Sequence, residues 1–275
     1  MTTLTTAVVE ETKAVSPGTN TLLLGATGSG KTYSLRTFID AGITPFILAT
    51  EPGVESTLGD IPADKLHWHY IPPANISWAE LADSAKKINQ FDIKTLSGLS
   101  DINKRKYTQW MDILDQCANF VCQRTGEEFG DVTTWGPDRA FIVDSLSGLN
   151  VMAMNLVVGS KPMKSMADWG IAMDNLERFI MKLTTDTRCY FVLTAHLERE
   201  HDEITGGTTV TASILGKKLA PKLPRFFDDV VMCQQKAGKF TWTTTSMGAD
   251  LKGRNLPLSD QIEPSFKQIV ERKRG

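Results

Sequence analysis

The sequence has few cysteines, no long apolar run and no excess of charge of either sign. Among its 275 residues are four cysteines, and no two of them form a CxxC pair; they are Cys117, Cys122, Cys189 and Cys233. Such sparse use of cysteine fits a reducing cytoplasm and argues against a scaffold built on disulfides.

Neither a membrane span nor a signal peptide is indicated. The longest apolar stretches, such as VMAMNLVV, are far shorter than the about 20 residues that a membrane helix needs. The N-terminal stretch MTTLTTAVVEETKAV lacks the basic start and the apolar core of a signal peptide. We therefore expect a cytoplasmic protein that has no membrane contact.

The charges nearly cancel, with 30 Lys and Arg against 32 Asp and Glu, for a formal net charge of −2. Any contact with nucleic acid would thus have to come from a local basic patch. Hydrophobic residues make up 41% and charged residues 23%, which is ordinary for a globular protein with a core. The length suits one large α/β domain or two small ones.

Short apolar segments that alternate with amphipathic ones predict an α/β fold. The segments that predict buried strands are Thr21–Leu24, Pro45–Thr50, Leu66–Ile71, Arg139–Asp144 and Cys189–Ala195. Because the segments between them predict helices, we expect a mainly parallel sheet with helices on both faces. Val230–Gln234 and Phe240–Thr244 predict a C-terminal antiparallel hairpin.

We expect one domain over residues 17–275, preceded by an N-terminal lead-in over residues 1–16 that ends in a Ser-Pro-Gly turn signal. The segment at about 74–135 is too long for a single crossover and is interpreted as a helical insertion. Within it, a capping box opens a predicted helix over 77–90. Apolar residues at helical spacing predict a second helix over 101–124, and its stripe consists of Tyr107, Trp110, Met111, Leu114, Ala118 and Val121.

The most specific motif is GATGSGKT at residues 25–32, which matches GxxxxGKT. It follows a predicted strand and opens a predicted helix, as a P-loop requires. Lys31 is expected to reach the β- and γ-phosphates of ATP, and the Thr32 hydroxyl to bind Mg²⁺. The alternative is a Gly-rich turn that carries Lys-Thr by chance. The expected nucleotide-binding residues are Gly25, Ala26, Thr27, Gly28, Ser29, Gly30, Lys31, Thr32 and Tyr33.

Three further polar residues follow predicted strands, at the edge of a parallel sheet where active sites lie. Asp144 stands where a Walker B carboxylate would hold Mg²⁺ through water. Glu51 is the expected general base that activates water, and the alternatives are a solvated loop glutamate or the use of Glu55 instead. His196 is expected to sense the γ-phosphate, unless it merely borders a loop.

The order of a P-loop, a strand ending in glutamate, the segment FIVDSLSGL and a polar-ended strand resembles the RecA-like ATPases. The segment LTAH, a later KxR and the C-terminal IEPSF look closer to the phage-encoded nucleotide-binding AAA-type family, which includes Sak-type single-strand annealing ATPases. The resemblance covers about residues 17–270 and is absent over 92–135. It implies a RecA-like P-loop NTPase fold, ATP and Mg²⁺ as cofactors, and a role on single-stranded DNA in phage recombination or replication. RecA itself usually has Gln in place of His196.

The resemblance also implies a DNA contact, because in RecA-like proteins the loop after the sensor strand touches single-stranded DNA. Residues 202–225 are expected to be a flexible loop with a basic cluster. Its residues are Lys217, Lys218, Lys222 and Arg225. The alternative is an ordinary solvated loop. A single-strand-binding protein is a further partner that such a role implies.

Lys252 and Arg254 are two residues apart and would point the same way on an extended segment. In RecA-like ring ATPases a KxR pair of this kind reaches the γ-phosphate of the neighbouring subunit, where a cation stabilises developing charge. The resemblance thus implies a homo-oligomeric ring or filament. The alternative is a solvated basic turn.

Two other functions remain open for a P-loop chain of this kind. One is a nucleotide-gated assembly protein with little hydrolysis. The other is a small-molecule kinase, which would need an acceptor pocket and usually an Arg-rich lid. The scattered arginines of this sequence favour the ATPase over the kinase.

Overall fold

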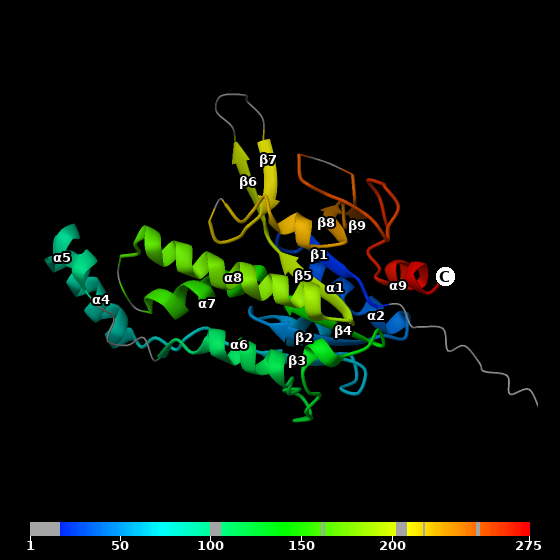
Figure 1. Cartoon of the computed structure of the whole chain (residues 1–275), viewed down its shortest axis with the longest axis horizontal. Helices are drawn as coiled ribbons and strands as arrows, with labels where there is room; N and C mark the ends of the chain where they lie inside the picture. Colours follow the sequence, from blue (N-terminus) through cyan, green and yellow to red (C-terminus); the bar gives the residue numbers. More distant parts are fainter. Residues whose placement is uncertain are drawn as a thin grey trace, which may run out of the picture.

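The structure is a computed structural model that describes residues 17–99, 106–159, 161, 163–201, 208–216, 218–245 and 248–275. The lead-in expected at residues 1–16 lies outside the described residues. The central element is a seven-stranded sheet with the strand order β3-β2-β4-β5-β1-β8-β9 (Figure 1). Its strands are β1 Asn20–Gly25, β2 Thr44–Ala49, β3 His67–Tyr70, β4 Arg139–Asp144, β5 Tyr190–Ala195, β8 Asp229–Lys236 and β9 Lys239–Thr243.

The sheet is parallel from β3 to β8, and β9 pairs antiparallel with β8 at the edge. The predicted strands and the predicted C-terminal hairpin are confirmed, with bounds that shift by one or two residues. The helices that accompany the sheet are α1 Lys31–Ser34, α2 Thr37–Asp40, α3 Val54–Leu58, α6 Gln109–Ala118, α7 Leu146–Val158, α8 Met166–Asp186 and α9 Lys267–Arg274.

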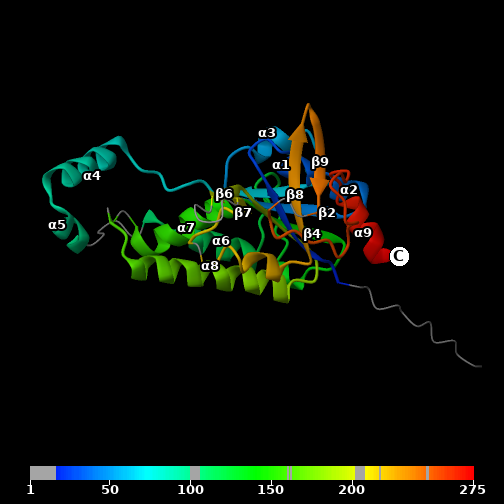
Figure 2. The same cartoon turned by 90° about the horizontal axis from the view of Figure 1, so that it is seen from above.

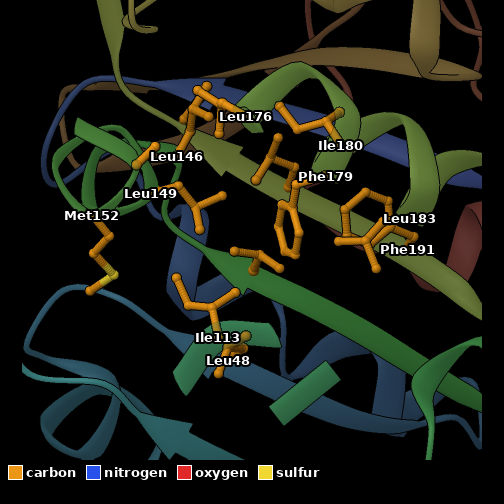
Figure 3. Packing of buried hydrophobic residues seen from close by; sticks show 14 of the residues in the cluster. Leu48, Ile113, Leu146, Leu149, Met152, Leu176, Phe179, Ile180, Leu183 and Phe191 are labelled. Atoms are coloured by element: carbon orange, nitrogen blue, oxygen red, sulfur yellow. The ribbon is translucent and has the colours of Figure 1, made fainter. Parts of the chain in front are cut away.

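Helices cover both faces of the sheet, because successive strand residues point to opposite sides. Leu22 and Leu24 of β1 belong to a core beneath α6, α7 and α8, whereas Leu23 between them belongs to a core with α2, α3 and α9. In Figure 3 residues of α8 lie over Phe191 of β5 on the first of these faces. This arrangement confirms the expected α/β class, a mainly parallel sheet with helices on both faces.

The segment expected as a helical insertion contains α4 Trp78–Gln90, α5 Ile93–Gly98 and α6. Figures 1 and 2 both show α4 and α5 standing away from the sheet and from the helices that cover it. The capping box at Ser77 is present, and its Glu80 side chain accepts the Ser77 backbone N–H. No α4 residue is buried.

The helix predicted over 101–124 is wrong in its extent, because α6 ends at Ala118. The side chain of Asn119 instead closes the loop that follows, donating to Glu128 at 2.8 Å and accepting the Gly130 N–H at 3.1 Å. The buried face of α6 also differs from the predicted stripe. Trp110 and Ile113 are buried, whereas Met111 and Leu114 of the predicted stripe are exposed.

Of the flexible loop expected at residues 202–225, residues 202–207 and 217 lie outside the described residues, and residues 208–212 form a strand. β6 Leu197–His201 pairs antiparallel with β7 Thr208–Ala212, and the two form a ribbon that projects from the sheet (Figure 1). A short 3₁₀ turn, Leu223–Phe226, then leads into β8. Within the described ranges, no helix combines the length and the apolarity needed to cross a membrane.

Candidate nucleotide-phosphate site

The predicted P-loop joins β1 to α1, and two of its glycines have backbone angles that suit glycine. Gly28 has φ of 74° and Gly30 has φ of 88°, both in the left-handed region that other residues rarely adopt. Gly30 is also the residue from which α1 begins. The loop therefore depends on glycine at these two positions for its shape.

Lys31 lies folded back onto this loop and is only 7% exposed. Its Nζ donates to the carbonyl of Gly25 at 2.8 Å and to that of Ala26 at 3.0 Å. Burial lowers the pKa of Lys31, while the negative charges of Asp144 and Glu51 act in the opposite direction. Phosphate oxygens can accept the same hydrogen bonds from Lys31 as these two carbonyls, and they also carry a full negative charge.

The carboxylate of Asp144, at the end of β4, connects β4 to α1 and to β5. Its Oδ2 accepts a hydrogen bond from the Thr32 hydroxyl at 2.8 Å, and its Oδ1 accepts one from the Thr194 hydroxyl of β5. A carboxylate and two hydroxyls are hard oxygen donors, which fit Mg²⁺ and its water ligands. Thr194 was missed in the sequence, although it precedes His196 in LTAH.

Glu51 and His196 were predicted separately, and the structure brings them together. Glu51 follows β2 and His196 follows β5, with β4 between these strands. His196 Nε2 lies 3.3 Å from Glu51 Oε2, and both side chains are partly exposed. A histidine in this position can hold the carboxylate in place. Glu55, the alternative base, is exposed on α3.

A second contact ties the end of β2 to the end of β4. The Thr50 hydroxyl donates to the Ser145 carbonyl at 2.7 Å and accepts the Ser145 N–H at 2.9 Å. The Asp144–Ser145 peptide bond is cis. Thr50 and Ser145 are both buried, so Glu51 and Asp144 project from strand ends that are fixed to each other.

A hollow of about 350 Å³ lies beside the P-loop, under the ribbon. It is lined by Ala26, Thr27, Gly28 and Ser29 of the loop, by Leu197, Arg199 and Val210 of the ribbon, and by residues 232–236 of β8. Arg199 is exposed and places a positively charged side chain near the P-loop of the same chain. No sequence pattern singles it out.

Lys252 and Arg254 lie toward the other end of β8. Lys252 pairs with Val230, and Arg254 Nη1 lies 2.9 Å from Asp228 Oδ1 at an exposed position. Burial lowers the pKa of Lys252, and the charge of Arg254 lowers it further. The structure places Arg254 beside Asp228 and not beside the P-loop of its own chain.

The turn that carries Arg254 is held by a buried carboxylate. Asp229 is fully buried, and its Oδ1 accepts the backbone N–H groups of Arg254 at 2.8 Å and Asn255 at 2.9 Å. Its Oδ2 accepts the Asn255 side-chain amide at 2.6 Å. The basic turn is therefore part of the folded body, and the expected extended segment is anchored at both Lys252 and Arg254.

The basic cluster expected to contact DNA is only partly free. Lys217 lies outside the described residues. Lys222 is paired with Glu177 of α8 at 3.0 Å, whereas Lys218 and Arg225 are exposed. Leucines between these cations are buried against the helices, so the segment is packed down and is not a free loop.

Comparisons with known proteins give a family match and matches to solved structures. A family model described as an AAA domain matches residues 18–255. Among solved structures, the flagellar accessory protein FlaH from Methanocaldococcus jannaschii is similar at 10% identity and a TM-score of 0.32, over 83% of this chain and 77% of that chain. No curated protein matches the sequence.

Replacing Asp229 with Ala should destabilise the fold by about 3 kcal/mol, because three partly buried N–H donors would lose their buried acceptor. Arg254→Ala is the matched control and should cost less than about 1 kcal/mol, since its ion pair is exposed. Urea denaturation followed by circular dichroism measures both. Equal losses for the two variants would contradict the anchoring role of Asp229.

Proposed function

Because the chain belongs to the AAA domain family, we propose that it binds ATP with Mg²⁺ at the P-loop and hydrolyses it. One observation carries this proposal. The carboxyl ends of β1, β2, β4 and β5 bring Lys31, Thr32, Asp144, Thr194 and the Glu51–His196 pair to one edge of the sheet.

In this proposal Lys31 and the backbone N–H groups of the loop hold the β- and γ-phosphates. Lys31 exchanges its two carbonyl contacts for phosphate oxygens. Thr32 and Asp144 hold Mg²⁺, and Thr194 keeps Asp144 oriented through its hydrogen bond. The metal, once bound, supplies neutralisation of the phosphate charge.

Glu51 acts as the general base. It accepts a proton from water, the water oxygen bonds to the γ-phosphorus, and the bond to the leaving ADP oxygen breaks, giving ADP and phosphate. His196 holds Glu51 in place at 3.3 Å. Since the same imidazole can donate to a phosphate oxygen, contact with the γ-phosphate would change its hold on Glu51.

The two alternatives differ in turnover. A nucleotide-gated assembly protein would bind ATP and hardly hydrolyse it, and a kinase would transfer phosphate only to an acceptor. The Glu51–His196 pair favours turnover over gated binding alone, since a base beside the P-loop serves to activate a nucleophile.

A role on single-stranded DNA belongs to the same proposal. It is supported by the exposed cations Lys218 and Arg225. A role in phage recombination or replication, a Sak-type activity and a single-strand-binding partner stay predictions from the resemblance, as does the trans role of Lys252 and Arg254 in a ring or filament.

Lys31→Ala should weaken ATP binding by about 100-fold, because charge-assisted hydrogen bonds to the phosphates are lost. Glu51→Gln should keep ATP binding and lower kcat by about 100-fold or more, since an amide cannot accept the proton. Calorimetric titration and phosphate release measure the two effects. Lys267→Ala, at an exposed position of α9, is the control and should match the wild type. Wild-type turnover by Glu51→Gln would assign the base elsewhere.

Binding to single-stranded DNA should weaken when Lys218 and Arg225 are both replaced by Ala, because phosphate contacts release counterions. The slope of log K against log salt should fall by about 1.4 for two lost contacts. Arg178→Ala with Lys182→Ala, on the exposed face of α8, removes the same charge and should change nothing. Fluorescence anisotropy with labelled oligonucleotides measures both, and equal loss in the two double variants would disprove a specific site.

Subunit mixing tests the trans role of Arg254. Arg254→Ala and Lys31→Ala proteins should each lack ATPase activity and should regain part of it when mixed. A mixed interface joins an intact P-loop to an intact arginine. Full activity of Arg254→Ala alone, or no recovery at any mixing ratio, would overturn this role.

A further inference from the structure

An exposed phenylalanine lies directly on the P-loop. Phe240 is the second residue of β9 and is 42% exposed. A Cβ atom placed on Gly30 would lie 3.0 Å from Phe240 Cδ1 and 3.5 Å from Cε1, so the ring contacts the last glycine of the loop. Part of the ring remains open to solvent beside the start of α1.

The direction of Phe240 follows from its strand. Trp242, two residues later, points to the same face and is fully buried, packed edge-on against Phe266 at a centroid distance of 4.9 Å. Phe240 therefore lies on the same face of β9 as Trp242, but beyond the edge of the core. The packing of the hairpin does not account for a large apolar side chain at this exposed position.

A second exposed aromatic side chain stands on α1. Tyr33 is 57% exposed and follows Gly30 by three residues. The Arg36 guanidinium lies 4.0 Å from the centre of its ring. The start of α1 therefore has an exposed aromatic side chain on the helix and another on the hairpin, both next to the phosphate-binding residues.

The sheet order indicates on which side of the P-loop a nucleoside would lie. Asp144, Thr194, Glu51 and His196 all come from β2, β4 and β5, so the reacting γ-phosphate belongs on that side of β1. The other end of the nucleotide then extends toward β8 and β9, where Phe240 lies.

We propose that Phe240 is the platform on which the base of the bound nucleotide stacks, with Tyr33 bordering the same space. This inference rests on the proposed ATP binding and adds the base subsite to it. Every base has a π-face, so stacking of this kind binds a base without identifying it. The hollow under the ribbon is the rival position for the base, but its lining includes no aromatic side chain.

The test compares a ligand that has a base with one that has none. Calorimetric titrations with Mg²⁺ and either ATP or inorganic tripolyphosphate are carried out on the full chain. Phe240→Ala should weaken ATP binding by about 10-fold or more and leave tripolyphosphate binding unchanged. Phe240→Trp should retain ATP binding, because it keeps an aromatic face.

Phe91→Ala is the matched control, since Phe91 is 41% exposed on the arm formed by α4 and α5. It should leave both affinities at the wild-type value. Unchanged ATP binding by Phe240→Ala would overturn the base platform and leave the hollow as the base site. Equal weakening of both ligands would also overturn it, because Phe240 would then only support the loop. A wild-type protein that binds neither ligand would overturn the proposed function, and this inference with it.

Discussion

A positive charge is held inside the P-loop, and the geometry of the site is arranged around it. An ammonium that is 7% exposed needs acceptors, because a buried charge without partners is costly. The loop supplies the carbonyls of Gly25 and Ala26, which requires the chain to curl tightly after β1. Asp144 and Glu51 supply negative charge from the ends of β4 and β2, which lie on the far side of β5 from β1. A sheet order that placed β4 and β2 farther from β1 would leave this lysine without its carboxylates.

The features that the sequence predicted are the local ones. Thr21–Leu24 is an apolar run that leads into a glycine-rich loop, and Arg139–Asp144 is a mainly apolar run that ends in a carboxylate. Each pattern can be recognised from a few consecutive residues. The ribbon was missed because LEREH, at 197–201, is polar on both faces, so no buried face sets a period of two. The helix end at Ala118 was missed because the apolar spacing continues beyond it, while Asn119 bonds with Glu128 and Gly130 across the following loop.

The missed parts of the site are contacts between distant segments. Glu51 and His196 are 145 residues apart, and only the order of β2, β4 and β5 brings them within 3.3 Å. Thr194 gives no signal of its own in a strand that is otherwise apolar. The contact between Phe240 and Gly30 likewise depends on how an edge hairpin lies over a loop that is over 200 residues away in sequence. Such pairings are set by tertiary packing, which no short window of sequence contains.

The hydrogen bond from Thr32 to Asp144 has a consequence for how the site is prepared. The hydroxyl donates its proton to the carboxylate and keeps its own oxygen lone pairs, so it can bind a cation without giving up this contact. Lys31 is held by the carbonyls of Gly25 and Ala26. Contacts within the protein thus hold each group close to where it is needed. Nucleotide binding then becomes an exchange of partners within a preformed site. The conformational entropy lost by ordering these side chains is lost during folding and not during binding.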